Sequence, residues 1–415
     1  MKILFISLGC DKNLVDSEVM LGLLTKNGYT LTDDETQADV IVINTCCFIH
    51  DAKEESINTI LEMAQYKEQN LKALVVTGCL AERYKDEILK EIPEIDAVLG
   101  TTSYDSIVEA VNMALAENAG EHFEHYESID YLPDNSEVER VVTTGNHMAY
   151  LKIAEGCDKR CSYCIIPKIR GHFRSVPMEE LLNEAKRLAS EGVKELVLVA
   201  QETTLYGKDL TGEKQLPLLL HELCKIEGIE WIRLLYCYPE EITDELIEAI
   251  KTEEKVCNYI DMPIQHSENR ILQRMGRRTS REDLVAVIKK LRQEIPDITI
   301  RTTLITGFPG ESEEDHEGLM NFVEECKFDR LGVFTYSPEE DTLAATFEDQ
   351  IDEEVKEARR DELMSLQQEI SYEHTQQLVG KTIKVMVEGY LFEDDIYVGR
   401  SYMDAPKVDG CVFIN

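Results

Sequence analysis

Three apolar runs near the start of the chain each end directly in a cysteine. The runs LFISLGC, VIVINTC and LVVTGC place Cys10, Cys46 and Cys79 immediately after successive strand-like segments. Amphipathic, charged stretches alternate with such runs over residues 1–118, and this alternation predicts an α/β domain, a doubly wound parallel sheet with helices on both faces. Because parallel strands end at one edge of their sheet, the three thiols are predicted to converge at that edge.

Converging thiolates suit an iron–sulfur cluster. Three cysteines bind three irons of a [4Fe–4S] cluster and leave the fourth iron without a protein ligand. Packing cysteines are the alternative, but these are expected within strands or on helix faces rather than at three successive strand ends. Cys47 competes with Cys46 as the second ligand, and Cys46 is preferred because it lies nearer the strand end.

A second set of cysteines lies on one short stretch, GCDKRCSYC, directly after another strand-like run. Cys157, Cys161 and Cys164 have the spacing C-x₃-C-x₂-C, which again offers three thiolates to a [4Fe–4S] cluster with one open iron. A structural zinc site is the alternative, but it needs four ligands and no fourth Cys or His lies close by. The spacing therefore favours a cluster that binds a substrate or cofactor at its open iron.

The rest of the chain divides by composition and periodicity. Residues 119–147 lack periodicity and are predicted to be a linker. A βα series of six strand-like runs over 148–347 falls short of a closed eight-stranded barrel, which predicts an open (β/α)₆ partial TIM barrel. A charged helix over 348–378 is predicted to connect this barrel to a small all-β, OB-like domain over 379–415, which is expected to be cut short because it has only three strand-like runs.

The charge balance is strongly acidic. The chain has 43 Lys and Arg against 81 Asp and Glu, for a formal net charge of −38. Such a surface repels phosphate backbones and favours a basic protein as a partner, although solubility alone also explains the acidity. Without a signal peptide or a membrane-spanning run, the twelve cysteines indicate a reduced, cytoplasmic protein.

The C-x₃-C-x₂-C motif after the first barrel strand resembles the signature of the radical S-adenosylmethionine (SAM) superfamily. With the N-terminal cysteines added, the chain is similar over nearly its whole length to the radical SAM methylthiotransferase family, which also carries a C-terminal TRAM domain. The resemblance lies in the runs SLGCDKNLVDSE, YLKIAEGCDKRCSYCIIPKIRG and DMPIQH. The chain departs from the family pattern at Asp11, where proline is more common, and at Cys47, where a small residue is common.

The resemblance implies a function. These runs are closest to the branch that adds a methylthio group to the β-carbon of an aspartate in the twelfth small-subunit ribosomal protein. That reaction uses two [4Fe–4S] clusters, two SAM molecules and an electron donor. One SAM methylates a sulfur held at the N-terminal cluster. The other yields a radical that removes hydrogen from the unactivated β-carbon.

Two other functions remain open. The sister enzymes methylthiolate adenosine in transfer RNA, but residues 376–415 have four Lys and Arg against six Asp and Glu, whereas an RNA-binding domain is expected to be basic. A non-catalytic electron carrier is the third candidate, and it would not bind SAM. Four residues are predicted to contact SAM, namely Tyr163, Gln201, Glu202 and Arg301. The alternatives are an ordinary loop aromatic for Tyr163 and a structural ion pair for Arg301. The remaining cysteines have no ligand spacing and are predicted to pack; they are Cys224, Cys237, Cys257, Cys326 and Cys411.

Overall fold

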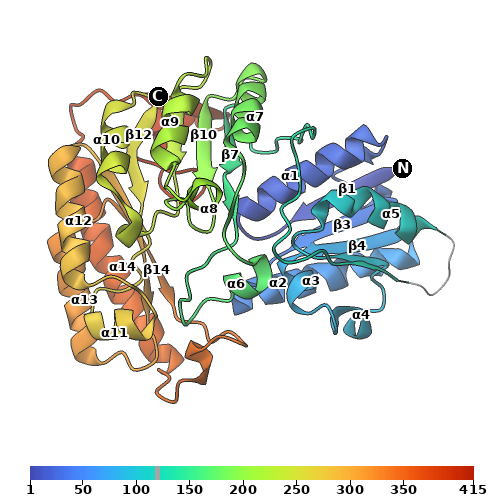
Figure 1. Ribbon diagram of the computed structural model, residues 1–415, viewed down its shortest axis with the longest axis horizontal. Coiled ribbons are helices and arrows are strands. Elements are labelled where there is room, and N and C mark those ends of the chain that lie inside the picture. Colours follow the sequence, from blue (N-terminus) through green and yellow to red (C-terminus); the bar gives the residue numbers. More distant parts are fainter. Residues whose placement is uncertain (117–121) are drawn as a thin grey trace. The chain divides into compact units, whose positions relative to one another are not determined.

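The structure is a computed structural model that describes residues 1–116 and 122–415 (Figure 1). The predicted boundary between residues 118 and 119 lies outside these ranges. The described chain forms two compact units. The first unit consists of residues 1–145, 150–159 and 164–184, and the second of residues 146–149, 160–163 and 185–415.

The first unit contains a six-stranded, wholly parallel sheet in the order β2-β1-β3-β4-β5-β6. Its strands are β1 (Lys2–Ser7), β2 (Thr30–Leu31), β3 (Val40–Thr45), β4 (Ala73–Gly78), β5 (Ala97–Leu99) and β6 (Phe123–His125). The order reverses between β1 and β3, as in a doubly wound fold. Strand β6 lies within the stretch predicted to be a linker, and pairing with the edge of β5 gives it a structure that its short, charged sequence does not predict.

Helices cover both faces of this sheet, as predicted. On one face α1 and α5 pack on Val40 and Val42, and on the other α2, α3 and α4 pack on Ile41 and Ile43. The helices are α1 (Asp11–Lys26), α2 (His50–Ala64), α3 (Cys79–Arg83), α4 (Ile88–Glu91) and α5 (Ile107–Leu115), with 3₁₀ turns at Glu35–Gln37, Gln65–Glu68 and Tyr104–Ser106. The unit also includes the short pair β8 (Ala154–Glu155) and β9 (Arg174–Ser175), and helix α6 (Ile166–Arg170), which packs against α3.

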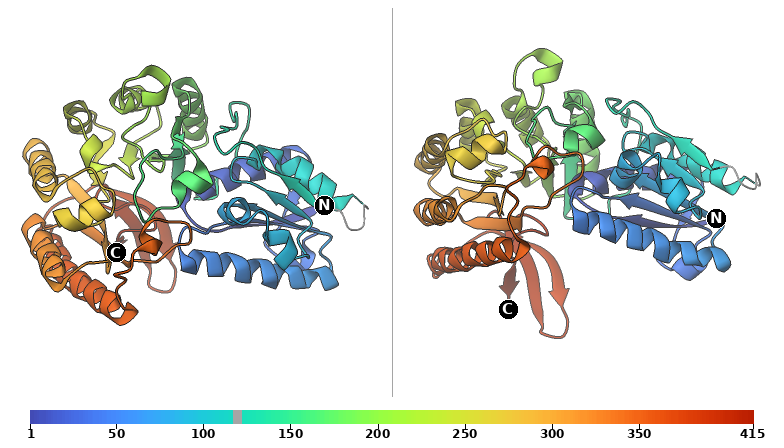
Figure 2. Two further views of the ribbon diagram at one scale, coloured as in Figure 1. Left: turned by 60° about the horizontal axis from the view of Figure 1, so that its bottom comes forward. Right: turned by 90° about the horizontal axis from the view of Figure 1, so that it is seen from below.

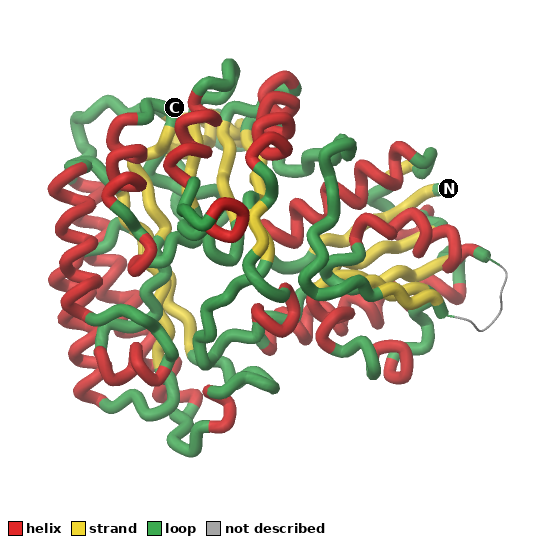
Figure 3. Tube along the Cα trace, in the orientation of Figure 1, coloured by secondary structure: helices red, strands yellow, loops and turns green. Residues whose placement is uncertain are grey.

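The second sheet has six strands in the order β14-β13-β12-β11-β10-β7, and every pair from β10 to β14 is parallel. Figure 3 draws the strands in yellow and the helices in red. The strands are β7 (Met148–Lys152), β10 (Glu195–Val199), β11 (Trp231–Leu234), β12 (Val256–Asp261), β13 (Thr299–Thr306) and β14 (Arg330–Thr335). The helices are α7 (Met178–Ser190), α8 (Lys208–Thr211), α9 (Leu216–Cys224), α10 (Asp244–Thr252), α11 (Asn269–Arg274), α12 (Arg281–Glu294) and α13 (Glu313–Cys326), with 3₁₀ turns at Pro239–Glu241 and Ala344–Thr346. Strands β7 and β14 are the two edges of the sheet, so the predicted open barrel is confirmed.

The C-terminal part begins with the long helix α14 (Glu353–Gln376), which packs against α13 and β14 (Figure 2). An antiparallel sheet of β15 (Val385–Leu391), β16 (Ile396–Ser401) and β17 (Val412–Ile414) follows, as predicted for a small all-β domain. Buried charges tie this sheet to the barrel strands. Glu195 of β10 accepts from Arg233 Nε at 2.7 Å and from Arg400 Nη2 of β16 at 2.6 Å.

The described helices include none with both the length and the hydropathy needed to cross a bilayer.

Candidate iron–sulfur cluster site

The three N-terminal cysteines lie at the carboxyl ends of neighbouring strands. Cys10 follows β1 and is the N-cap residue of α1, Cys46 follows β3, and Cys79 follows β4 as the first residue of α3. The strand order reverses between β1 and β3, and open α/β sheets bind ligands at such a reversal.

Two glycines bring these cysteine loops into close contact. Gly9 has φ +85°, and a Cβ built there would lie 2.7 Å from Cys46 Cβ and 2.9 Å from Cys46 Sγ. Gly78 has φ +94°, and its Cβ would lie 2.6 Å from the Thr45 carbonyl oxygen. Only glycine combines this conformation with such an approach, so the loops after β1, β3 and β4 meet because of these two residues.

Asn13, in the first turn of α1, ties the same loops together and is fully buried. Its Nδ2 donates to the carbonyl oxygen of Leu8 at 3.0 Å and to that of Thr45 at 2.9 Å. Cys79 Sγ lies 3.9 Å from Asn13 Oδ1. One amide side chain therefore contacts the strand ends before Cys10 and Cys46 and the third cysteine itself.

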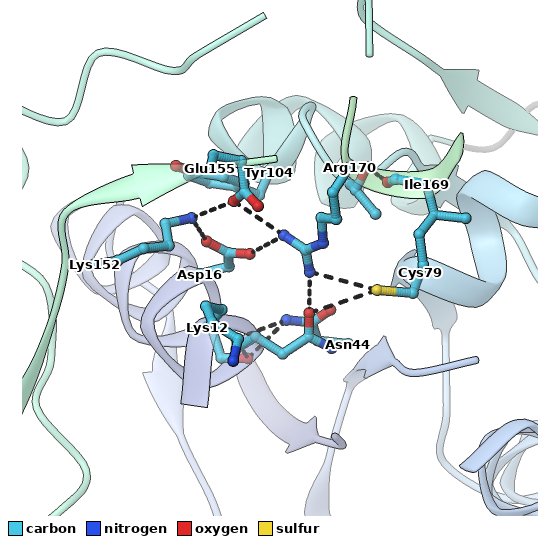
Figure 4. A network of polar contacts seen from close by, with 12 residues as sticks. Lys12, Asp16, Asn44, Cys79, Tyr104, Lys152, Glu155, Ile169 and Arg170 are labelled. Carbon is cyan, nitrogen blue, oxygen red and sulfur yellow. Dashed lines mark hydrogen bonds and ion pairs between the residues drawn. The ribbon is translucent and has the colours of Figure 1, made fainter. Parts of the chain in front are cut away.

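A buried group of four charged side chains adjoins Cys79 (Figure 4). Arg170 Nη1 donates to Asp16 Oδ2 at 2.9 Å and to Glu155 Oε2 at 3.2 Å, and its Nη2 donates to Asn13 Oδ1 and to Cys79 Sγ, the latter at 3.5 Å. Lys152 Nζ pairs with Asp16 and with Glu155. Two carboxylates balance two cations, which is how buried charges avoid a large desolvation penalty.

Burial changes the pKa of two thiols of this set. It raises the pKa of the Cys46 and Cys79 thiols, and the positive charge of Arg170 acts in the opposite direction on both. A buried thiolate therefore needs further positive charge nearby. Bound iron supplies that charge, since a coordinating thiol is deprotonated outright.

The structure distinguishes the two adjacent cysteines after β3. Cys46 touches Gly9 in the loop that carries Cys10. Cys47 is fully buried in the hydrophobic core with Ile60 and Met63 of α2. This geometry supports Cys46 as the ligand.

The donor set fits a cluster rather than one metal ion. Among the described residues, no three His, Cys, Asp or Glu side chains gather closely enough to hold a single ion. A [4Fe–4S] cluster requires a different arrangement, because each cysteine binds a different iron and the sulfurs only need to surround the cluster. Two buried thiols and one exposed thiol on converging loops meet that requirement, and the exposed thiol of Cys10 leaves one side open to solvent.

The C-x₃-C-x₂-C set follows β7 and β8. In the first unit, the Cys157 N–H donates to the Gly171 carbonyl at 3.1 Å. In the second unit, Cys161 Sγ lies 3.9 Å from Tyr238 Oη, and the Ser162 N–H donates to the Met275 carbonyl at 2.9 Å. Cys164 is partly exposed. Backbone hydrogen bonds at Cys157 and Ser162 therefore fix the course of this short stretch.

The four residues predicted to contact SAM lie in different surroundings. Gln201 and Glu202 follow β10, where Glu202 is fully buried and accepts from the Thr204 N–H at 3.1 Å. The Tyr163 ring packs edge-on against Phe308. Gln201 and Glu202, just beyond the carboxyl end of β10, suit a barrel ligand, and the roles of all three residues stay predictions.

Arg301 differs, because it lies near the start of β13. Its Nη1 donates to Asp261 Oδ1 at 2.8 Å, and its Nε lies 3.4 Å from Asp409 Oδ1. These ion pairs give Arg301 a structural role, and a contact with SAM stays a prediction.

The five remaining cysteines are mostly packing residues, as predicted. Cys237, Cys257 and Cys326 are buried, and burial raises the pKa of the Cys326 thiol to about 11. Cys224 is partly buried. The prediction is wrong for Cys411, which is exposed just before the edge strand β17.

Three family models match the chain. The model described as uncharacterized protein family UPF0004 matches residues 2–100, the radical SAM superfamily model matches 151–323, and the TRAM domain model matches 379–415. The ribosomal protein uS12 methylthiotransferase RimO of Lachnoclostridium phytofermentans is 64% identical over 416 residues, which cover 100% of this chain and 94% of that relative. The chain belongs to the RimO family. RimO of Clostridium perfringens (strain ATCC 13124) is 54% identical over 415 residues and covers 100% of this chain and 92% of the relative.

Membership of the RimO family confirms the resemblance drawn from the sequence motifs. It makes the chain a radical SAM methylthiotransferase, with SAM and [4Fe–4S] clusters as its cofactors. Solved structures share the fold. The radical SAM methyltransferase TsrM of Kitasatospora setae aligns with a TM-score of 0.60 at 14% identity, over 83% of this chain and 76% of that chain. The radical SAM enzyme OxsB aligns with a TM-score of 0.55 at 13% identity, over 90% of this chain and 56% of that chain.

Five residues of this site were not predicted from the sequence, namely Asn13, Asp16, Lys152, Glu155 and Arg170. All five lie inside the runs SLGCDKNLVDSE and YLKIAEGCDKRCSYCIIPKIRG that carry the family resemblance. The signal that could have indicated them is a charged or amide side chain within six positions of a predicted ligand cysteine.

Proposed function

We propose that this chain transfers a methylthio group to the β-carbon of an aspartate in ribosomal protein uS12. The observation that carries the proposal is the 64% identity, over the whole chain, to a relative named as a uS12 methylthiotransferase. The two cysteine sets support it, because each offers three thiolates to a [4Fe–4S] cluster and leaves one iron open.

Each set has a separate role in the proposal. Cys10, Cys46 and Cys79 hold the cluster that carries the sulfur to be transferred. Another three cysteines hold the cluster that binds SAM, namely Cys157, Cys161 and Cys164. The cofactors supply a methyl group, a sulfur atom and a radical able to break an unactivated C–H bond, while the protein binds and orients the reactants.

The residues around the N-terminal cysteines support the role given to that set. Gly9, Gly78 and Asn13 hold the N-terminal thiols at one edge of the sheet, while burial of Cys46 and Cys79 keeps water from those ligands. An electron donor completes the reaction, because cleavage of SAM consumes an electron. We place the reaction in the cytoplasm, where thiols stay reduced.

The charge of the chain favours a protein substrate over transfer RNA. A net charge of −38 attracts a basic ribosomal protein and repels a phosphate backbone. The C-terminal sheet is no exception, because residues 376–415 are themselves acidic. Binding of transfer RNA in preference to isolated uS12 at physiological salt would contradict this assignment.

The direct test is anaerobic incubation of the reconstituted chain with SAM, a reductant and isolated uS12, followed by mass spectrometry of uS12 peptides. We expect a methylthio group on one aspartate. The Cys157→Ala variant is the matched control and should leave uS12 unmodified. A methylthio group found on transfer RNA but not on uS12 would refute the proposed substrate.

A further inference from the structure

We propose that Arg170 sets the reduction potential of the N-terminal cluster through a hydrogen bond to the sulfur of Cys79. This inference rests on the proposed function, since it requires a cluster on Cys10, Cys46 and Cys79. The contact itself is in the structure, where Arg170 Nη2 lies 3.5 Å from Cys79 Sγ. Arg170 acts on the ligand rather than on the substrate, so it is a positioning residue.

The surroundings of Arg170 fix the direction of its guanidinium. Both Asp16 and Glu155 accept from Nη1, which leaves Nη2 to face Asn13 Oδ1 and Cys79 Sγ. Arg170 is 2% exposed, so water does not compete for these contacts. A planar, fully charged fork held along one edge presents its other N–H groups in a fixed geometry.

Balancing the two carboxylates does not require Arg170 to reach the sulfur. Lys152 Nζ already contacts Asp16 and lies 2.9 Å from Glu155 Oε2. Two cations and two carboxylates sum to zero before any thiolate is counted. The contact with Cys79 is therefore additional, and it places a positive N–H group against a ligand that is negative when iron is bound.

Such a contact changes the energy of reduction. An added electron increases the negative charge on the cluster and on its sulfur ligands, and a hydrogen bond to sulfur strengthens with that charge. Hydrogen bonds to the sulfurs and net charge are two determinants of iron–sulfur potentials. Arg170 is thus expected to stabilise the reduced cluster and raise its potential.

Arg170 lies close in the sequence to the second set of cysteines. Arg170 ends α6, only six residues after Cys164, the last cysteine of the C-x₃-C-x₂-C set. Helix α6 packs against α3, which begins at Cys79. One short segment therefore carries a ligand of the SAM-binding cluster and supplies a hydrogen bond to a ligand of the other cluster.

The test uses the full chain in which the C-x₃-C-x₂-C cysteines are changed to alanine, so that only the N-terminal cluster is loaded. Reduction of this cluster is followed by electron paramagnetic resonance during an anaerobic potentiometric titration. We expect R170Q to lower the ratio of reduced to oxidised cluster at a fixed potential about tenfold, which is a shift of about 59 mV to more negative values for one electron. Arg170→Lys keeps the charge but not the fork, so a smaller shift in the same direction is expected.

Arg174 provides the matched control. It lies four residues further along the same segment, and its Nη1 donates to the His172 carbonyl rather than to a cysteine. Arg174→Lys should leave the potential unchanged. If R170Q fails to fold, the comparison of R170K with R174K decides the question.

Equal cluster potentials in R170K and R174K, or in R170Q and the chain that retains Arg170, would overturn the inference. A shift of the same size in the reciprocal chain, which keeps only the C-x₃-C-x₂-C cluster, would also overturn it, because the effect would then not be specific to the contact with Cys79. Failure of the cluster assignment within the proposed function looks different, since no N-terminal cluster would then load even with Arg170 intact.

Discussion

Changing Gly9 to alanine tests whether the loops of Cys10 and Cys46 meet as the structure shows. A Cβ at Gly9 would lie 2.7 Å from Cys46 Cβ and 2.9 Å from its sulfur, well inside the roughly 3.5–4.0 Å of a normal carbon contact. Overlap of this kind costs about 1–3 kcal/mol. The positive φ of +85° adds about 1–2 kcal/mol for a residue with a side chain.

Gly28 provides a control with the same backbone strain. Its φ is also +85°, but a Cβ there would meet no atom within 4 Å. In urea denaturation of the metal-free variants, the free energy of unfolding of Gly9→Ala should therefore be lower than that of Gly28→Ala by roughly 1–3 kcal/mol, which is the cost of the steric overlap. Displacement of Cys46 should also lower the iron content of reconstituted Gly9→Ala, and Gly28→Ala should load normally. Equal stability and equal iron in the two variants would refute the close approach of the loops.

Three other changes test separate parts of the account. Asn13→Ala leaves two strand-end carbonyls without their donor and should cost about 2–5 kcal/mol in urea denaturation, whereas Asn27→Ala, which removes one exposed hydrogen bond, should cost less than about 1 kcal/mol. Cys46→Ala should lose the N-terminal cluster while Cys47→Ala keeps it, as measured by iron content; the reverse result would exchange the two roles. Burial raises the pKa of the Glu195 carboxyl, but two arginines outweigh burial and hold that pKa low. Their ion pairs with Glu195 therefore stabilise the fold above the unfolded pKa of about 4.3, and this stabilisation is lost as the pH falls through the folded pKa. Glu195→Gln should therefore cost about 3–5 kcal/mol at pH 7, with a smaller stability difference from the unchanged chain in acid; an equal difference at both pH values would contradict this.

The convergence of Cys10, Cys46 and Cys79 follows from local pattern alone. Each cysteine comes directly after an apolar run, and parallel strands end at one edge of their sheet. The sequence therefore sufficed to predict both the sheet and the edge where the thiols meet. Helix α1 shows the limit of the same pattern. The helix begins at Asp11, and its polar first turn carries no apolar periodicity that would mark this start in the sequence.

Contacts between residues far apart in the chain could not be predicted from local sequence patterns. Arg170 and Asn13 are 157 positions apart, and nothing in either segment indicates that they meet. The helix-forming stretch after β4 folds as two short helices, α3 and α4, and its composition does not indicate the turn between them. Arg301 was chosen for its place in a barrel strand, but periodicity does not show which partners a strand's first residues meet, and here they are carboxylates.

Counting clusters tests the central claim most directly. Iron analysis and Mössbauer spectroscopy of oxygen-free, reconstituted protein should find two [4Fe–4S] clusters in the unchanged chain. A variant with Cys10, Cys46 and Cys79 all replaced by alanine should hold one. A single cluster in both proteins would contradict the claim that two separate sets of three cysteines each hold a cluster.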